Sequence, residues 1–356
     1  MKLIRAVLQH IQSSIASKDL NTGKPELFYM YDVICVGSAT VDAFASTKTD
    51  LVRIYTPHIK EVLIAYPAGT KVLMTTLNFT VGGGGTNSAV SMARMGLKTA
   101  YLGKVGKGTN SAFILSLLKK EKVDTRFTIK GKNHSGYSVI LDAKGRDRTV
   151  LAYKGSNNDL KVSELKLSQL KTKWFYFASM VGESYKTQIQ LAKFAVSKKI
   201  KIAYNPSSYL TRKGASFLKP LLSRTHLLVL NKEEACNLVG EGTKNELLTR
   251  LMALGPQEVI VTDGNKGAFT CFDGVCYEIK PRGIKVVDAT GAGDAFASTF
   301  VGARIKGKNI SDALHLANVN AESVIQDYGA KNRLLSWKEL LQGLRKIKYK
   351  MIRKRI

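Results

Sequence analysis

Short apolar, β-branched runs alternate with longer amphipathic segments along most of this chain, and this alternation restricts the fold more than any other feature. The predicted strands are residues 31–37, 99–104, 173–178, 200–204, 225–230 and 257–263. The predicted helices that lie between several of them are residues 86–96, 109–122, 184–198, 231–239 and 243–254. Strand–helix alternation of this kind predicts an α/β fold, with a mostly parallel sheet covered by helices on both faces.

Two regions interrupt the alternation, because they contain β-type runs with no helix between them. Residues 51–80 include KVLMTTLNFT, and residues 136–153 include GYSVILDAKGRDRTVLAY. In the second region two β runs flank Lys144-Gly145, a pattern typical of a hairpin. These segments predict a small antiparallel sheet beside the main one. After residue 291 the chain is predicted to be mostly helical, over 291–306, 311–326 and 336–348.

The length and composition are those of an ordinary globular protein. The chain has 356 residues, of which 44% are hydrophobic and 23% charged, and no apolar run reaches membrane-spanning length. The first 30 residues lack the unbroken apolar core of a secretion signal. Residues 3–16 could form a short amphipathic helix. Met30 directly precedes the first predicted strand, which suggests the hypothesis that translation starts there and that residues 1–30 are an extension outside the core.

The cysteines and histidines indicate neither a zinc site nor a disulfide framework. The four cysteines contain no CxxC pair, and the five histidines are scattered. Cys271 and Cys276 flank Asp273-Gly274, a hairpin turn signal, and could face each other across it. Because the context is typical of a cytoplasmic protein, we expect two free thiols there rather than a disulfide.

The formal net charge of +28 at pH 7 permits two interpretations. One is nucleic-acid binding, and the other is a solvated basic surface. Lysines are spread over nearly every predicted helix, and only residues 345–356 form a concentrated basic block. We therefore prefer the solvated surface, and either case would attract anionic substrates such as nucleotides.

The stretch VVDATGAGDAF, residues 286–296, combines glycines with a carboxylate where a helix is predicted to begin. The first turn of a helix carries unpaired N–H groups and the positive end of the helix dipole, and glycine lets an anion approach them. Asp294 would be a poor ligand for a phosphate, but it could accept the proton of a hydroxyl that attacks phosphorus. The alternative is an acidic residue that only stabilises the helix.

Two further stretches carry side chains suited to a polyol. In TVGGGGTNSAVSMARMG, residues 80–96, four glycines require a tight turn or a close approach to a ligand, and Asn87 could bind a hydroxyl. In GSATVDAFAS, residues 37–46, Asp42 stands just past the first predicted strand, where α/β sheets bind ligands. Its carboxylate could accept hydrogen bonds from two hydroxyls, or it could belong to an Asx-type turn.

Two other motifs follow predicted strands. In LNKEEACNL, Asn231 and Glu234 could hold Mg²⁺ through water, or form only a helix N-cap with glutamate at the third position. In VTDGNKGAF, Thr262, Gly264 and Gly267 could wrap a nucleotide phosphate or only turn the chain. No GxxxxGK[ST] occurs and no GxGxxG follows the first strand, which argues against a P-loop or a dinucleotide-binding fold.

The motifs in this order resemble the ribokinase (PfkB) family of carbohydrate and nucleoside kinases. The likeness runs from about residue 31 to about 340, and its two signatures are GGGGTNSAVSMARMGLKTAYLGKVG at 82–106 and DATGAGDAFASTF at 288–300. The resemblance implies a doubly wound, mostly parallel sheet with helices on both faces, and a small antiparallel β lid from about 51–80 and 136–153. Residues 1–30 and the basic tail, 341–356, would lie outside the kinase domain, 31–340.

The resemblance also implies roles for individual residues. Asp294 corresponds to the catalytic base, and the anion hole corresponds to Gly291, Ala292 and Gly293. Sugar-contacting positions correspond to Asp42, Gly82, Gly83 and Asn87. Asn231 and Glu234 match the metal–phosphate motif, and the nucleotide contacts correspond to Thr262, Gly264, Gly267 and Asn318. Asp288 and Thr290 resemble positions that offer carbonyls to K⁺, in a site closed by the loop near Gly329-Ala330.

The chain departs from the family pattern at two places. Many sugar kinases carry lysine where this chain has Gly84. The common G-x-D-x-x-G lacks its acid here, at residues 106–111. These departures keep open a nucleoside kinase as the alternative substrate class.

The function that the resemblance implies is an ATP- and Mg²⁺-dependent transfer of the γ-phosphoryl group to a hydroxyl of a sugar, in the cytoplasm. Lid strands in this family often pair between subunits, which suggests a homodimer. A basic nucleic-acid-binding paralogue without catalysis is a third interpretation, and the intact GAGD argues against it. The sequence does not name the sugar or the hydroxyl.

Overall fold

The computed structural model describes residues 31–47, 51–55, 60–66, 68–142 and 148–355. The sequence-based expectations of an amphipathic helix over 3–16, of a translation start at Met30 and of a turn at Lys144-Gly145 lie outside these residues.

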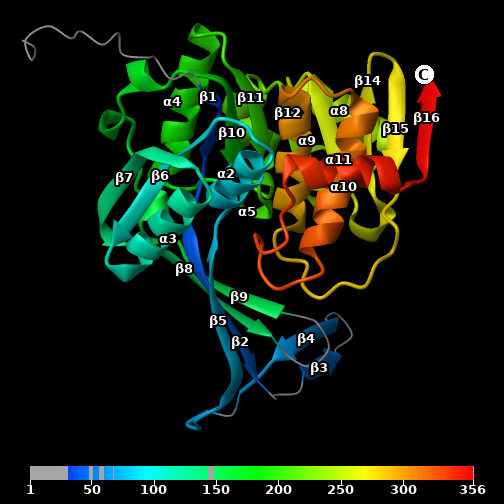
Figure 1. The fold of residues 1–356 in the computed structure, drawn as a ribbon. Coiled ribbons are helices and arrows are strands. Elements are labelled where there is room, and N and C mark those ends of the chain that lie inside the picture. Colours follow the sequence, from blue (N-terminus) through cyan, green and yellow to red (C-terminus); the bar gives the residue numbers. More distant parts are fainter. Residues whose placement is uncertain (1–30, 48–50, 56–59, 67, 143–147, 356) are drawn as a thin grey trace, which may run out of the picture. The chain divides into compact units, whose positions relative to one another are not determined.

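A large sheet of ten strands organises most of the described chain (Figure 1). In spatial order its strands are β16 (Met351–Arg355), β15 (Val275–Ile279), β14 (Ala268–Phe272), β13 (Glu258–Thr262), β12 (Leu227–Asn231), β11 (Lys201–Asn205), β10 (Thr172–Ala178), β1 (Tyr31–Val36), β6 (Thr99–Lys107) and β7 (Asp124–His134). Neighbours from β13 to β7 pair in parallel, whereas β14, β15 and β16 are antiparallel. Because β1 lies between β6 and β10, the strand order reverses there, which confirms the predicted doubly wound sheet.

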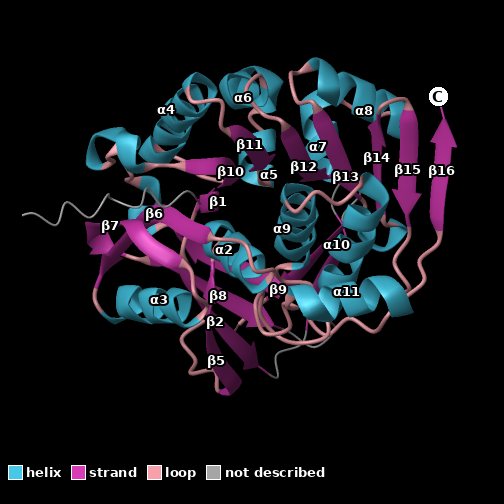
Figure 2. Ribbon diagram, turned by 45° about the horizontal axis from the view of Figure 1, so that its top comes forward, coloured by secondary structure: helices cyan, strands magenta, loops and turns pink. Residues whose placement is uncertain are grey.

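Helices cover both faces of this sheet (Figure 2). One layer consists of α4 (Glu183–Ser197), α6 (Gly214–Leu222), α7 (Lys232–Val239) and α8 (Lys244–Ala253). The other consists of α2 (Gly84–Arg94), α3 (Thr109–Lys120), α9 (Ala292–Ile305), α10 (Ile310–Val324) and α11 (Trp337–Lys346). Alternate strand residues supply two buried cores, since Val33 and Cys35 pack with the α2–α9–α10 layer and Ile34 and Val36 with the other.

A small sheet projects from this body in the order β5 (Met74–Gly82), β2 (Thr40–Thr47), β8 (Gly136–Asp142) and β9 (Arg148–Tyr153). The β2–β5 and β8–β9 pairs are antiparallel, and the central β2–β8 pair is parallel. A separate antiparallel pair is formed by β3 (Leu51–Tyr55) and β4 (Lys60–Ile64). The predicted small sheet beside the main one is therefore confirmed.

Three segments differ from their sequence-based assignments. Residues 37–46 enter β2, so the Asx-turn interpretation of Asp42 is wrong: Asp42 lies within a strand, opposite Thr80 and Ser138. Strand β7 was not predicted, because it contains few apolar residues. The basic block at the carboxyl end forms β16, which pairs with β15, so the last part of the chain is not entirely helical.

The hairpin of β14 and β15 places Cys271 opposite Cys276, with their Cα atoms 4.0 Å apart, and the two form a disulfide. This outcome contradicts our expectation of free thiols, which rested on cellular context rather than on local geometry. Within the described part of the chain no group of three or more His, Cys, Asp or Glu side chains could hold a metal. Among the same residues, no helix has the length and apolarity needed to cross a membrane.

Candidate active site

A cavity of about 550 Å³ lies at the carboxyl ends of the parallel strands next to the reversal of strand order. Its wall includes a residue at or just after the end of each of five strands, β1, β10, β11, β12 and β13: Ser38, Ala178, Asn205, Asn231 and Thr262. The small sheet contributes Asp42, Ser138, Val150 and Ala152. In doubly wound folds this edge is where ligands bind, and the volume is that of an ordinary small-molecule site.

The structure brings most of the predicted site residues together in this wall. Those that line the cavity are Asp42, Gly83, Asn87, Asn231, Glu234, Thr262, Thr290, Gly291, Gly293 and Asp294. Those that lie outside its lining are Gly82, Gly264, Gly267, Asp288, Ala292 and Asn318. Residues as far apart in the sequence as Asp42 and Asp294 therefore meet at one surface.

Gly291, the N-cap residue of α9, has a left-handed conformation, with φ of 79°. A Cβ atom at this position would lie 2.3 Å from the Cβ of Ala330, so only glycine fits between α9 and the loop at 329–330. The N–H groups of the next residues belong to the first helical turn, where no intrahelical acceptor exists. Ala292 N donates to the Ala289 carbonyl at 3.3 Å, and the positive end of the α9 dipole at this turn suits an anion.

Asp294 lies in this first turn and its carboxylate reaches the cavity. Its Oδ2 accepts a hydrogen bond of 2.7 Å from Asn87 Nδ2, at the start of α2. Burial raises the pKa of Asp294, whereas the Asn87 bond and the charge of Lys331 oppose the rise. The carboxylate is thus held in place by Asn87 at the cavity wall.

Asp42 and Gly82 lie against each other where β2 and β5 pair. Asp42 is buried, and its Oδ1 accepts a 2.9 Å hydrogen bond from Thr40 Oγ1. A Cβ atom on Gly82 would lie 1.7 Å from Asp42 Oδ2, so the absence of a side chain at residue 82 makes room for the carboxylate. Helix α2 begins at Gly84, within the glycine run, which is therefore a tight connection rather than a loose loop.

Asn231 and Glu234 form a reciprocal cap at the start of α7. Asn231 Oδ1 accepts from Glu234 N at 2.8 Å, and Glu234 Oε2 accepts from Asn231 N at 3.0 Å. The capping interpretation is therefore confirmed. Both residues also line the cavity, and burial raises the pKa of Glu234 to about 7. A cation beside this carboxylate would offset the burial, so the pair fits a water-mediated Mg²⁺ contact as well.

The segment before α9 is tied to the loop at 329–330. Asp288 Oδ1 accepts hydrogen bonds from Thr290 N at 2.9 Å and from Thr290 Oγ1 at 2.6 Å, and Asp288 Oδ2 accepts from Gly329 N at 3.0 Å. These bonds use the Asp288 side chain, and they hold the segment before α9 next to the loop at 329–330. Elsewhere, Asn318 on α10 is buried, and its Nδ2 has no hydrogen-bond partner within the described residues.

Sequence reasoning missed several residues of the wall, chiefly Lys154, Asn157 and Asn158 after β9. Asn157 belongs to a short 3₁₀ turn, η1 (Gly155–Asn158), and its amide exchanges two 2.9 Å hydrogen bonds with the backbone of Ala39. The signal available in the sequence was the polar stretch KGSNN directly after an apolar run.

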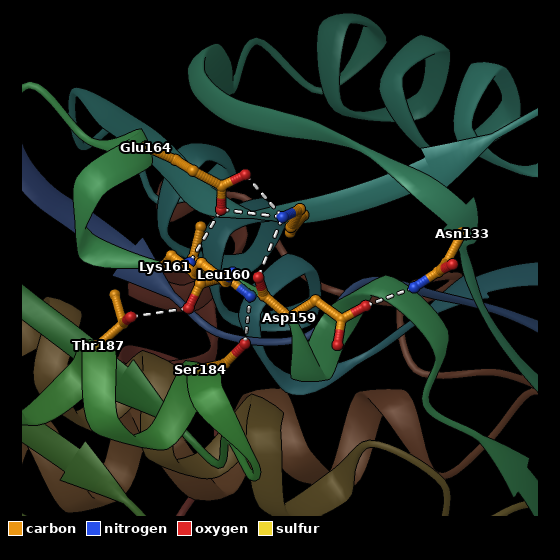
Figure 3. A network of polar contacts seen from close by, with 8 residues as sticks. Asn133, Asp159, Leu160, Lys161, Glu164, Ser184 and Thr187 are labelled. Atoms are coloured by element: carbon orange, nitrogen blue, oxygen red, sulfur yellow. Dashed lines mark hydrogen bonds and ion pairs between the residues drawn. The ribbon is translucent and has the colours of Figure 1, made fainter.

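A polar network anchors the chain that follows η1 (Figure 3). Its hydrogen bonds join Asn133 to Asp159, Lys104 to Asp159 and Glu164, Lys161 to Glu164, and Leu160 to both Ser184 and Thr187. Glu164 thus receives the ammonium of a buried lysine from β6, at 2.7 Å. These contacts hold in place the segment that follows Asn157 and Asn158, two residues of the cavity wall.

Sequence reasoning also missed Lys331, which is buried beside the cavity wall and follows Gly329-Ala330 directly. Its ammonium donates to Asn87 Oδ1 and to the carbonyl of Val81. No local pattern marked it as a site residue.

Comparisons with known proteins identify relatives in both sequence and fold. A family model described as pfkB family carbohydrate kinase matches residues 32–337. A ribokinase of Bacillus subtilis is 30% identical over 269 residues, which cover 74% of this chain and 87% of that protein. The structure of Arabidopsis thaliana ribokinase, described as complexed with ribose and ATP, superposes with a TM-score of 0.74 at 20% identity, covering 89% of this chain and 99% of that one. A nucleoside kinase of Methanocaldococcus jannaschii gives a TM-score of 0.71 at 21% identity, covering 89% and 99%.

Proposed function

The chain belongs to the pfkB family of carbohydrate kinases and is a sugar kinase, and on this premise we propose that it transfers the γ-phosphoryl group of ATP to a hydroxyl of a sugar in the cavity. The observation that carries the proposal is the position of the Asp294 carboxylate, in the cavity wall and in the first turn of α9. A proton acceptor and a set of backbone donors for an anion thus share one site.

The reaction places four demands on the chain's own residues. Asp42 and Asn87, with the backbone of Gly82 and Gly83, bind and orient the sugar. Asp294 accepts the hydroxyl proton as the oxygen attacks phosphorus, and the N–H groups of residues 291–293 stabilise the transferring group. The small sheet acts as a lid that excludes water from the cavity.

The nucleotide end of the site would be formed by residues around β12, β13 and α10. Thr262, in the cavity wall, would contact phosphates together with Gly264 and Gly267, and the Nδ2 of buried Asn318, which has no partner within the described residues, suits an acceptor on the base. Mg²⁺, held through water by Glu234 and Asn231, would neutralise charge on the phosphates. Carbonyls of Asp288 and Thr290 would hold K⁺ beside the anion hole.

Our proposal for the organisation of the chain follows the same resemblance. Residues 31–340 form the kinase unit, 1–30 an extension and 341–356 a basic tail whose last strand extends the large sheet. Exposed Leu77 and Phe79 on β5 support a homodimer through the lid. We place the protein in the cytoplasm, with no membrane or nucleic-acid partner.

An acceptor screen tests the proposed function. We expect ADP release with Mg·ATP to depend on an added sugar, and ³¹P NMR to show a new phosphomonoester. The panel contains pentoses, hexoses and inositol, with nucleosides as the arm for the alternative substrate class, each with and without K⁺. No acceptor-dependent ADP release across the panel would contradict the proposal, and release with nucleosides alone would assign the alternative.

Replacing Gly82 by alanine is expected to raise the KM for the sugar about tenfold or more, because the added Cβ would collide with Asp42 Oδ2 and displace a charged hydrogen-bonding group. The KM for ATP serves as the internal control and should change little. Steady-state kinetics with the best acceptor measure both constants. An unchanged KM for the sugar would mean that Asp42 does not bind the sugar.

Replacing Glu234 by glutamine is expected to raise the Mg²⁺ concentration for half-maximal activity about tenfold.

The same variant, Glu234→Gln, should have a higher Tm than wild type at pH 8. The folded-state pKa of Glu234, about 7, lies above its ordinary value of 4.5. Ionisation of Glu234 therefore lowers the free energy of unfolding as pH rises from 4.5 to 7. The Tm difference should vanish at pH 4.5. If Glu234→Gln had a lower Tm than wild type at pH 8 and an unchanged Mg²⁺ dependence, Glu234 would only cap its helix.

A further inference from the structure

Lys331 is buried, and its ammonium donates hydrogen bonds to residues of the glycine-rich motif at 80–96. Only 6% of its surface is exposed. Its Nζ donates to Val81 O at 2.6 Å, to Thr86 Oγ1 at 3.2 Å and to Asn87 Oδ1. These acceptors lie at the end of β5 and in the first turn of α2, far from residue 331 in sequence.

The contact with Asn87 determines which way its amide faces. Lysine can only donate, so the Asn87 atom that meets Lys331 must be the oxygen, Oδ1. The amide nitrogen, Nδ2, then faces Asp294 Oδ2, at 2.7 Å. Without the ammonium, either end of this amide could face the carboxylate, and the oxygen would repel it.

We propose that Lys331 is a positioning residue for phosphoryl transfer, acting through Asn87 on Asp294. It orients the Asn87 amide so that an N–H holds Asp294 Oδ2, which leaves Oδ1 for the acceptor hydroxyl, and its positive charge favours the ionised carboxylate. This inference rests on the proposed role of Asp294 as the base.

The charges around Lys331 support this role. Burial lowers the pKa of Lys331 to about 7, while Asp42, Asp294 and Glu121 raise it and Arg94 lowers it further. The ammonium in turn lowers the pKa of Asp294, against the effect of burial. Lys331 is therefore charged mainly below pH 7, which is the range in which Asp294 most needs help to stay ionised.

The loop that carries Lys331 has anchors of its own. Arg94 Nη1 donates to the carbonyls of Lys331 and Leu334, at 3.1 and 2.8 Å, and Arg94 also pairs with Glu121. Gly329 N donates to Asp288 at 3.0 Å. Because these bonds do not involve the lysine side chain, removing the ammonium should leave the loop in place.

The test compares Lys331→Met with Arg94→Lys by pH profiles of kcat and kcat/KM for the sugar. Lys331→Met keeps the length and the apolar stem but removes the charge and the donors. We expect its kcat/KM to fall about tenfold or more at pH 6 and the acid limb to move to higher pH, with the deficit shrinking above pH 7. Arg94→Lys keeps a positive charge but loosens the same loop, so it should lower Tm without moving the acid limb.

Lys331→Ala with added ethylamine gives a second readout, in case the methionine variant folds poorly. We expect the amine to restore kcat and to return the acid limb toward the wild-type position, since it can occupy the space left by the side chain. A folded Lys331→Met with a wild-type pH profile, or a deficit that is the same at every pH, would overturn the proposal. Loss of activity in Asp294→Asn together with either result would show that the inference failed and the base assignment did not.

Discussion

Asp294→Asn is expected to lower kcat by about 10²–10⁴-fold with little change in ATP binding. The asparagine retains the size of the side chain and can still meet Asn87, but it cannot accept the hydroxyl proton. Because the substitution leaves the N–H groups at the start of α9 in place, the KM for ATP should stay within a small factor. Steady-state kinetics and calorimetric titration with ATP measure the two effects separately.

Asp312→Asn is the matched control for this substitution. Asp312 is the third residue of α10, as Asp294 is the third residue of α9, and it lies outside the cavity wall. Both substitutions remove a carboxylate from a first helical turn, so any effect on helix stability is common to them. Near-normal turnover in Asp294→Asn, or equal losses in both variants, would mean that Asp294 only stabilises its helix.

Gly291→Ala is expected to reduce kcat about 10²–10³-fold. The new Cβ would lie 2.3 Å from that of Ala330, and residue 291 has a positive φ, so the first turn of α9 or the loop at 329–330 must shift. Either shift moves the N–H groups away from the transferring phosphoryl group. The sugar KM should change much less than kcat, because the donors act mainly on the transition state.

Gly307→Ala is the control for Gly291→Ala, because it adds the same backbone strain without a collision between side chains. Gly307 follows the other end of α9 with the same φ of 79°, and a Cβ there would meet nothing within 4 Å. The two variants should lose similar stability from the left-handed backbone, while Gly307→Ala keeps wild-type kcat. If both lost activity equally, the anion-hole role of Gly291 would have no support from this pair.

The elements that could be predicted from the sequence are those with local signals. The nearly continuous apolar runs of β12 and β13 identified central parallel strands, and the glycines and Asp294 at 291–294 identified a helix N-terminus suited to an anion. In each case the residues that form the signal are also the ones that make the structure, so periodicity and spacing were sufficient.

The elements that could not be predicted depend on contacts between distant residues. Asp42 follows β1 closely enough to look like a loop residue, and only its pairing with Thr80 and Ser138 makes it part of a strand. Lys331 meets Asn87 across 244 positions of sequence. The capping pair at Asn231 and Glu234 is local and was anticipated, but the same two side chains serve a helix end and line a cavity, and spacing alone does not separate the two uses.

The most direct test of the account is a crystal structure with the sugar, Mg·ADP and aluminium fluoride as a planar mimic of the transferring group. We predict that the mimic accepts hydrogen bonds from N–H groups of residues 291–293, and that the acceptor hydroxyl lies within about 3.2 Å of an Asp294 carboxylate oxygen. A mimic bound away from the start of α9, or a sugar hydroxyl directed to some other base, would contradict it.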